Sequence, residues 1–372
     1  MPHVVVLGAG VIGLQSAIYL LEAGHKVTVV ASHFPGDRHA QYTSPWAGAH
    51  WRTHAGSNDL REQKWDLETY NEWNRQITSA STVQDRQTLG LKIHDSLNYW
   101  DNPPTDPIWW APYVDSFATL PTASTTIQAI NASHPSPSRI RDAATFRAIA
   151  INVPTYLLHL RTQILSKGGT FIRATIPVSS PTNDLPSSLR QTAALVHRIT
   201  SSDAEVFVNA TGLGAGKLCN DAACHPVKGQ TVLVKGEAEA IRTRLGEGYI
   251  SYVIPRPGSG TTVVGGTKEV GTWDAGTSEE VTDRILRGAR ALAPELLTGS
   301  DGGFEVVSVQ VGFRPGRKGG ARVEGERVGR EGTGVVHAYG HDGAGYQNSV
   351  GVGREVVRLV EGMVGVEGRA KL

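Results

Sequence analysis

Three glycines near the start of the chain have the spacing of a turn that binds a dinucleotide phosphate. Gly8, Gly10 and Gly13 form the pattern GxGxxG. The first glycine permits a tight turn, the second lets a pyrophosphate approach the backbone, and the third lets the next helix pack closely on the strand. The N–H groups and dipole at a helix start favour an anion. The pattern therefore predicts a phosphate site that includes Val11 and Ile12.

The residues around these glycines predict a strand–turn–helix–strand unit that would position the site. Residues 4–7 are all apolar, as in a strand buried on both faces of a parallel sheet. Apolar residues then recur at helical spacing as far as Gly24, and residues 26–30 predict a second strand. An acidic residue usually follows such a strand and binds ribose hydroxyls. Ser32 and His33 stand there instead, so the motif predicts a dinucleotide and leaves its identity open.

Length and composition limit the classes of protein that this sequence can specify. A chain of 372 residues is long enough for two domains and a large core. The net charge of +1 gives no overall basic field for nucleic acid. We find no run of about 18 apolar residues, so we expect no membrane span. Because the first strand begins almost directly after Met1, we also expect no signal peptide.

Two further features concern the cellular compartment. Cys219 and Cys224 are the two cysteines of the chain and indicate an intracellular protein without a disulfide framework. We expect free thiols, with a local disulfide as the alternative. The last three residues, Ala370-Lys371-Leu372, resemble the Ser-Lys-Leu peroxisomal address and predict a peroxisomal import receptor as a partner. A chance tripeptide is the alternative. The sequence leaves the oligomeric state open, a homo-oligomer included.

The order of patterns predicts an α/β protein with two interleaved domains. Residues 1–56, 146–225 and 305–372 carry βα patterns and predict one discontinuous, Rossmann-like nucleotide-binding domain. Residues 57–145 begin with a helical pattern and continue into a segment rich in Pro and Trp. Residues 226–304 alternate as antiparallel strands and end in a helix. These two inserts predict an α+β domain with an antiparallel sheet, which would bind the substrate.

Several motifs, taken together and in order, closely resemble the FAD-dependent D-amino-acid oxidase and D-aspartate oxidase family. The resemblance implies an FAD cofactor and hydride transfer from Cα of a D-amino acid to flavin N5. Oxygen would reoxidise the flavin and yield hydrogen peroxide, and the imino acid would become a 2-oxo acid and ammonia. The motifs are VVVLGAGVIGL, SPWAGA (44–49), VNATGLGAGKL (208–218), YVIPRP (252–257), GGTKEVGTWD (265–274), VGFRPGRKGGARVE (311–324) and HAYGHDGAGYQNS (337–349).

This chemistry needs a clamp for the substrate carboxylate more than it needs acids and bases, because the flavin carries the difficult step. By resemblance, Arg314 is the arginine that binds the carboxylate, and a guanidinium can do so through two parallel hydrogen bonds. Tyr252 matches the tyrosine that makes the second contact, and Tyr249 is a weaker candidate on the same strand. A surface ion-pair arginine and a core tyrosine are the alternatives.

The resemblance also implies which residues contact FAD. The loop 340–347 would offer backbone N–H groups at a helix start, which stabilise the negative charge of reduced flavin. Ser32 lies where family members vary. Besides Arg314 and the glycine turn, the cofactor-binding candidates are Ser32, Ser44, Ala47, Gly48, Ala49, Ile176, Thr211, Gly212, Gly343, Ala344, Gly345, Tyr346 and Gln347.

Three positions favour an acidic substrate, since a buried carboxylate needs cationic partners. His54 stands where oxidases of neutral D-amino acids have an aromatic residue. Lys268 stands where D-aspartate oxidases have arginine, and either Arg242 or Arg244 matches a further arginine of those enzymes. The resemblance therefore implies D-aspartate as the substrate, with D-glutamate and N-methyl-D-aspartate as further candidates.

Three other functions stay open. An oxidase of neutral D-amino acids would gain support if both Arg242 and Arg244 pointed into solvent. A flavin-free NAD(P)-dependent dehydrogenase would leave SPWAGA and HAYGHDGAGYQ unexplained. A non-catalytic protein that binds FAD is disfavoured because Arg314 and Tyr252 are both retained.

Overall fold

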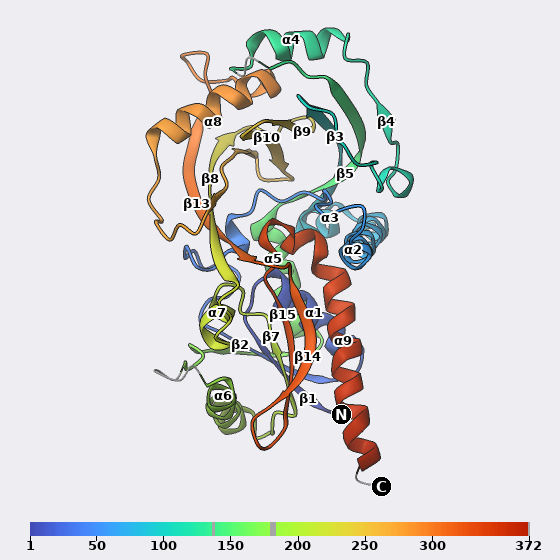
Figure 1. Cartoon of the computed structure of the whole chain (residues 1–372), viewed down its shortest axis with the longest axis vertical. Coiled ribbons are helices and arrows are strands. Elements are labelled where there is room, and N and C mark those ends of the chain that lie inside the picture. The colour runs from blue at the N-terminus through green and yellow to red at the C-terminus, as the bar shows by residue number, and fades with distance from the viewer. Residues whose placement is uncertain (136–137, 179–183, 371–372) are drawn as a thin grey trace.

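Two β-sheets lie at opposite ends of the elongated molecule in the computed structural model (Figure 1). The structure describes residues 1–135, 138–178 and 184–370. In these ranges no helix combines the length and the apolar character that crossing a membrane requires. Both cysteines, Cys219 and Cys224, are free thiols, as expected.

The lower sheet of Figure 1 is the predicted nucleotide-binding sheet. Its order is β14-β15-β7-β1-β2-β6, with β14 antiparallel and the other strands parallel. The strand–turn–helix–strand prediction is confirmed by β1, α1 and β2. The strands are β1 (His3–Leu7), β2 (Lys26–Ala31), β6 (Thr170–Arg173), β7 (Val206–Asn209), β14 (Arg322–Val328) and β15 (Thr333–Tyr339).

Helices cover both faces of this sheet, which explains why its parallel strands are apolar throughout. Val4 and Val6 of β1 pack in a core with α1, α5 and α9, whereas Val5 and Leu7 pack in another core with α6 and α7. The helices are α1 (Val11–Glu22), α5 (Val153–Ser166), α6 (Leu185–Thr200), α7 (Gly214–Leu218) and α9 (Gly345–Ala370).

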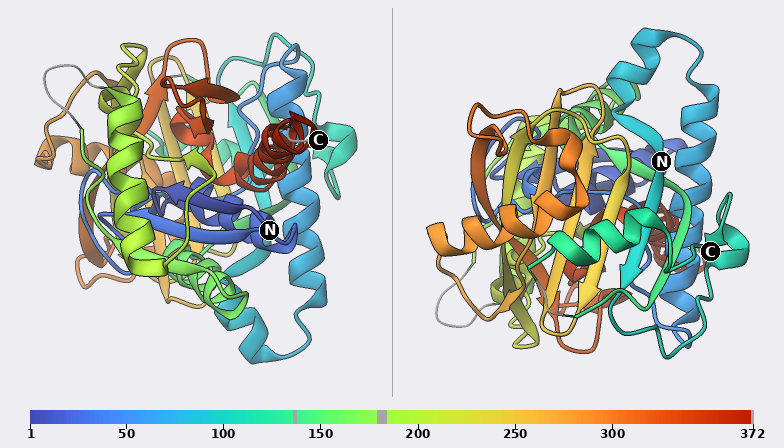
Figure 2. Two further views of the ribbon diagram at one scale, coloured as in Figure 1. Left: turned by 90° about the horizontal axis from the view of Figure 1, so that it is seen from below. Right: turned by 90° about the horizontal axis from the view of Figure 1, so that it is seen from above.

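The upper sheet has nine strands in the order β12-β8-β11-β10-β9-β3-β5-β4, and β13 pairs with β8. Figure 2 shows α4 and α8 lying across its outer face, and their apolar residues form a core with the strands below. The strands are β3 (Leu91–Trp100), β4 (Ala118–Thr119), β5 (Asp142–Ile151), β8 (Cys224–Lys235), β9 (Ile241–Gly246), β10 (Tyr249–Arg256), β11 (Thr261–Gly265), β12 (Glu269–Val270) and β13 (Val306–Arg317).

The remaining helices of the described residues lie near the upper sheet or in its connections. α2 packs against α9 and thereby joins the two parts of the molecule, and α3 packs against α5. They are α2 (Leu60–Ser79), α3 (Val83–Leu89), α4 (Thr125–Ser133) and α8 (Glu279–Leu292), with short 3₁₀ turns η1 (Ser44–Trp46), η2 (Ala111–Tyr113), η3 (Pro294–Leu296) and η4 (Asp342–Ala344).

Membership of the sheets differs from the expected division of the chain at two places. The nucleotide-binding part was expected to include residues 146–225 and 305–372, yet β5 and β13 belong to the upper sheet. The reason for β13 is long antiparallel pairing with β8, from Val306 opposite Val234 to Arg317 opposite Cys224, with one register shift between Val306 and Ser308. This pairing satisfies the backbone groups of both strands. It also carries β13 down from the upper sheet towards the lower one (Figure 1).

Candidate active site

A large cavity is lined by residues of both sheets and of the loops between them. Its volume is about 1290 Å³. Pockets for drug-sized ligands have volumes of roughly 300–1,000 Å³. The cavity can therefore hold a dinucleotide together with a small substrate. Its wall runs from the ends of β1 and β2, past η1, to β10, β13 and the loop that precedes α9.

The glycine turn shapes one wall of the cavity. Gly8 has a left-handed backbone (φ 102°), and a side chain there would place its Cβ 2.4 Å from the carbonyl oxygen of Ala210. Gly13, one of the glycines proposed to bind the cofactor, does not line the cavity, but its expected role in helix packing is confirmed. A Cβ at Gly13 would lie 2.2 Å from the oxygen of Gly8, so this glycine acts through close packing of α1 against the turn.

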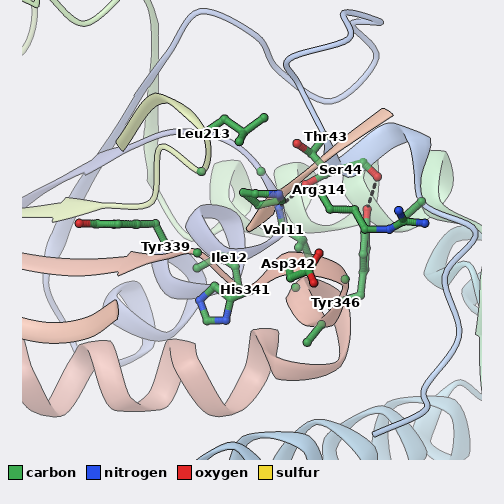
Figure 3. A pocket seen from close by; sticks show the side chains of 18 of the residues that line it. Val11, Ile12, Thr43, Ser44, Leu213, Arg314, Tyr339, His341, Asp342 and Tyr346 are labelled. Carbon is green, nitrogen blue, oxygen red and sulfur yellow. Dashed lines mark hydrogen bonds between the residues drawn. The ribbon is translucent and has the colours of Figure 1, made fainter. Parts of the chain in front are cut away.

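The start of α1 faces the cavity and suits a phosphate group. Its first turn contains no acidic side chain, and no side chain caps it at Gly10. The Val11 N–H donates to Ser44 Oγ at 3.0 Å, and the Tyr346 hydroxyl donates to the Ser44 carbonyl at 3.0 Å (Figure 3). A Cβ at Gly10 would approach Ser44 Oγ to 3.1 Å. These residues form a narrow, electropositive cradle for a pyrophosphate.

The part of the cavity near the end of β2 offers neutral groups to a nucleoside. Ser32 Oγ lies 3.3 Å from the hydroxyl of Thr175, and Ile176 lines the same wall. His33 stacks on His39 with ring centres 4.5 Å apart, and burial lowers the pKa of His33. A ribose at this end would therefore meet hydroxyl groups and a neutral imidazole in place of a carboxylate.

The loop before α9 lines the cavity at the other end. Gly343 and Ala344 of η4 contribute to its wall, and so do Gly345, Tyr346 and Gln347, which form the start of α9. Ala47, Gly48 and Ala49 line the cavity as well. The helix dipole and the backbone N–H groups at this terminus favour negative charge, which is the requirement of a reduced flavin.

Asp66 of α2 has a buried carboxyl group that contacts both the start of α9 and the segment around Thr53. It accepts hydrogen bonds from Asn348 Nδ2 at 2.6 Å and Gln347 Nε2 at 3.4 Å, and from the Thr53 hydroxyl. Burial raises the pKa of Asp66 to about 8 even though these donors act to lower it. Asn348 Oδ1 in turn lies 3.1 Å from Nδ1 of His341. The sequence offered no signal for this role, because Asp66 lies within an ordinary amphipathic helix.

Arg314 projects from β13 into the cavity without an acidic partner in the described part of the chain. Its Nη1 donates to the carbonyl oxygen of Thr267 at 3.1 Å. The guanidinium lies against Gly229 of β8, where an added Cβ would approach Nη1 to 2.6 Å. β8 and β13 are paired at this point, so the strands themselves hold the guanidinium. It can offer its free N–H groups to a carboxylate in the cavity.

Tyr252 belongs to β10. It lies beside Arg314 and lines the same cavity. Its ring packs against Gly265, where an added Cβ would approach the hydroxyl oxygen to 2.4 Å. Burial raises the pKa of the Tyr252 hydroxyl, and the charge of Arg314 and its hydrogen bond to this hydroxyl act in the opposite direction. The hydroxyl therefore stays protonated near neutral pH and can donate to a carboxylate.

His54 lines the cavity as expected, and its side chain is exposed there. Nη2 of Arg52 lies 3.4 Å from Nε2 of His54. Because a guanidinium only donates, Nε2 must accept and the ring proton belongs on Nδ1 while this contact holds. Desolvation, followed by the charge of Arg52, lowers the pKa of His54. These effects act against the basic charge that was expected of His54.

Arg52 is the cation at this position, and the sequence analysis missed it. The signal was present, since His50, Arg52 and His54 alternate with Trp51 and the buried Ala55 in an extended segment. Residues two apart in extended backbone share a side. All three residues line the cavity, and Thr53 does so as well.

The prediction that Arg242 or Arg244 enters the pocket is wrong, because neither lines the cavity. In β9 it is the intervening Thr243 that does so, as the period of two in a strand requires. Arg242 pairs with Glu295 at 2.5 Å, and its side chain is 16% exposed. Arg244 is fully buried and pairs with Asp101 at 2.9 Å. Neither arginine points into solvent, so the condition set for a neutral substrate is not met either.

Lys268 lines the cavity as expected, but its charge is already balanced. Its Nζ lies 2.9 Å from Oδ2 of Asp342, and its side chain is 61% exposed. Tyr249, the weaker candidate on β10, does not line the cavity, and its hydroxyl donates to Asp101 Oδ2 at 2.5 Å. Apart from Tyr249, Gly13, Arg242 and Arg244, the residues proposed from the sequence lie along the cavity. Lining residues that the sequence analysis missed include Thr43, Arg52, Leu213, Thr267, Trp273, Tyr339, His341 and Asp342.

Comparison with known proteins agrees with this site. A family model described as FAD dependent oxidoreductase matches residues 3–359. The chain is 33% identical to a D-amino-acid oxidase of Schizosaccharomyces pombe, over 96% of this chain and 95% of the relative. It is 31% identical to a D-aspartate oxidase of Cryptococcus neoformans var. grubii, over 96% of each chain.

The fold agrees as well. A solved structure of glycine oxidase from Bacillus cereus superposes with a TM-score of 0.69 at 20% identity, over 97% of both chains. The chain thus belongs to the family of FAD-dependent oxidoreductases. Its cofactor is FAD, and its curated relatives are flavin-dependent amino-acid oxidases.

Proposed function

We propose that the protein oxidises an acidic D-amino acid, D-aspartate or a close analogue, to the 2-oxo acid and ammonia, with oxygen as acceptor and hydrogen peroxide as product. The observation that carries the proposal is Arg314. It projects into the cofactor cavity beside Tyr252, lies flat against Gly229, and has no acidic partner in the described ranges. Such a guanidinium is a ready receptor for a substrate carboxylate.

In this proposal the residues of the chain bind and orient the substrate. Arg314 holds the α-carboxylate through two N–H groups, and the Tyr252 hydroxyl donates a third hydrogen bond. FAD, when bound, supplies the acceptor for the hydride from Cα and returns the electrons to oxygen. The N-terminus of α9 and the loop from Gly343 to Gln347 favour negative charge on that side of the cavity.

The acidic substrate is supported by the charges around Tyr252. Arg52 and Arg314 both line the cavity together with Tyr252, and the charges of both guanidiniums act to lower the pKa of its hydroxyl against the larger effect of burial. Neither forms an ion pair within the described residues. A substrate with a single carboxylate would leave one of them unpaired in a cavity closed by cofactor and substrate, which is unfavourable.

A neutral D-amino acid is the second candidate. Two observations favour it: Lys268 is balanced by Asp342, and both Arg242 and Arg244 lie outside the cavity. The relative from Schizosaccharomyces pombe bears the general name D-amino-acid oxidase. The two candidates share the chemistry and differ in the group that the side-chain end of the cavity receives.

The experiment is anaerobic mixing of the yellow, FAD-loaded protein with single amino acids, followed by peroxide measurement in air. We expect the visible flavin absorbance to bleach with D-aspartate and to persist with L-aspartate. Bleaching by D-alanine or D-methionine without a response to D-aspartate would replace the acidic candidate with the neutral one. Arg314→Ala should raise KM for every substrate while the flavin stays bound.

Localisation in peroxisomes is a separate part of the proposal. It is supported by the terminal Ala370-Lys371-Leu372, of which Lys371 and Leu372 lie outside the described residues. A fluorescent protein fused in front of the last ten residues should enter peroxisomes. The same fusion without the final three residues should stay outside, and equal behaviour of the two fusions would refute this part.

A further inference from the structure

Arg52 combines position and charge in a way that the clamp at Arg314 does not explain. It lies in the segment 50–54, is half-buried, and its side chain lines the cavity. Its recorded side-chain hydrogen bond goes to a neutral ring, Nε2 of His54 at 3.4 Å, and the described residues offer it no carboxylate.

We propose that Arg52 is the residue that selects the substrate side chain, by binding the second carboxylate of an acidic D-amino acid. The inference rests on the proposed function and deepens it, because it assigns substrate choice to one side chain. Arg314 and Arg52 line the cavity from different chain segments, β13 and residues 50–54, and Tyr252 of β10 lines it as well. The two carboxylates of D-aspartate are joined by a short two-carbon chain and can meet one guanidinium each.

The other basic residues near the site are already satisfied. Lys268 pairs with Asp342, Arg242 with Glu295 and Arg244 with Asp101. Of these three, Lys268 alone lines the cavity, and a substrate carboxylate there would share its ammonium with Asp342. Arg52 would exchange water for the carboxylate and would keep its contact with His54. This difference favours Arg52 as the receptor.

His54 and Asp66 give Arg52 its position. Nε2 of His54 accepts from Arg52, which orients one edge of the guanidinium and leaves the other N–H groups for a ligand. Between them in sequence, Thr53 bonds through its hydroxyl to the buried carboxyl of Asp66. The indole of Trp51 donates to the Asp66 carbonyl at 2.8 Å. The segment that carries Arg52 is therefore fastened to α2 on both sides of this residue.

The test compares Arg52→Gln and Arg52→Lys with a matched arginine control, Arg242→Gln, whose side chain lies outside the cavity. For the FAD-loaded proteins, kcat/KM is measured with D-aspartate and with D-alanine. Arg52→Gln should lower the ratio of the two values at least about 100-fold, since it leaves a buried carboxylate unpaired. Arg52→Lys should recover part of the ratio, and Arg242→Gln should leave it as in the wild type.

A second measurement does not depend on turnover. Succinate carries two carboxylates and propionate one, and each should perturb the visible flavin spectrum when it binds. Arg52→Gln should weaken succinate binding at least about tenfold more than propionate binding. This result stands even if the wild type oxidises no D-amino acid, which would refute the proposed function alone. Equal losses for both acids, an unchanged D-aspartate to D-alanine ratio in Arg52→Gln, or a ratio that falls in Lys268→Met instead would overturn the role of Arg52.

Discussion

Nζ of Lys268 lies 2.9 Å from Oδ2 of Asp342, and this ion pair connects the two parts of the molecule at the cavity. Lys268 follows β11 of the upper sheet, and Asp342 begins the 3₁₀ turn that leads into α9. Because the lysine charge is balanced by a residue of the chain itself, Lys268 adds little attraction for a second carboxylate. It acts as a contact between the two halves at a partly exposed edge.

We expect Lys268→Met to change substrate preference very little. A surface ion pair of this exposure contributes only about 0–1 kcal/mol. kcat/KM should change by less than about fivefold and by similar factors for D-aspartate and D-alanine. Steady-state peroxide release measures both values. A loss confined to D-aspartate would show that the lysine leaves Asp342 and binds substrate.

Replacement of Gly229 should disable the clamp without removing the cofactor. A methyl group there would lie 2.6 Å from Nη1 of Arg314 and would displace the guanidinium. We expect Gly229→Ala to lower kcat/KM at least about 100-fold for every D-amino acid, while the flavin absorbance per protein stays normal. Gly56→Ala is the matched control, since an added Cβ there meets no atom within 4 Å. If Gly229→Ala kept full activity, Arg314 would not need this surface.

Arg244 should matter for stability and not for substrate choice. Its side chain and that of Asp101 are 0% and 1% exposed, and Arg244 also donates to the carbonyl of Ser138 at 2.7 Å. Removing one partner of a buried pair costs about 3–5 kcal/mol, because the other charge is left without compensation. We expect Arg244→Met to lower the free energy of unfolding by about this amount in denaturant titrations.

The substrate ratio gives the second readout for this variant. D-aspartate and D-alanine should be discriminated as in the wild type, provided that the measurement is made on the folded, flavin-loaded fraction. Adding Asp101→Asn to Arg244→Met should restore part of the stability, since it removes the stranded charge. If Arg244→Met changed the ratio of kcat/KM for D-aspartate to that for D-alanine, Arg244 would have a role in substrate choice after all.

Asp66 should make stability depend on pH over a defined window. In the unfolded chain an aspartate loses its proton near pH 4, whereas burial raises the pKa of Asp66 in the folded protein to about 8. The folded protein therefore binds more protons between these values, and the free energy of unfolding falls as the pH rises from about 4 to about 8. Above pH 8 the effect is complete and stays constant.

Asp66→Asn removes this titration and is the variant to compare. We expect its thermal midpoint, relative to that of the wild type, to rise steadily from pH 4 to pH 8 and then to level off. Both proteins are measured with FAD bound. Two midpoint curves that run parallel across this range would show that Asp66 does not hold its proton.

The features that could be predicted from the sequence are local ones. The strand β1, the glycine turn and α1 follow one another within about twenty residues, so periodicity and glycine spacing determine them together. The residues around Arg314 and the loop before α9 lie in continuous motifs and were placed along the cavity for the same reason. Sheet membership of β5 and β13 was not predictable in this way, because their partners are distant in sequence.

The residues that tune the site were harder to predict. Successive residues of a strand point to opposite sides, and the sequence does not say which side faces the cavity. In β9, Thr243 faces it and its neighbours Arg242 and Arg244 do not. The charge of Lys268 is balanced by Asp342, which lies 74 residues away. Asp66 acts through Gln347 and Asn348, more than 280 residues further along the chain. Such pairings arise from tertiary structure alone.

The position of Arg314 on a strand that is paired with β8 has an evolutionary consequence. Its guanidinium lies against Gly229 on β8, so we expect any larger residue there to displace it. Arg52 belongs to a segment that meets β5 at its start, where the Trp51 N–H donates to the Ile149 carbonyl, and its guanidinium contacts the side chain of His54. If Arg52 selects the substrate as proposed, single substitutions in residues 50–54 would change the nutrient that such an enzyme consumes, while the residues that hold every substrate for oxidation would be inherited unchanged.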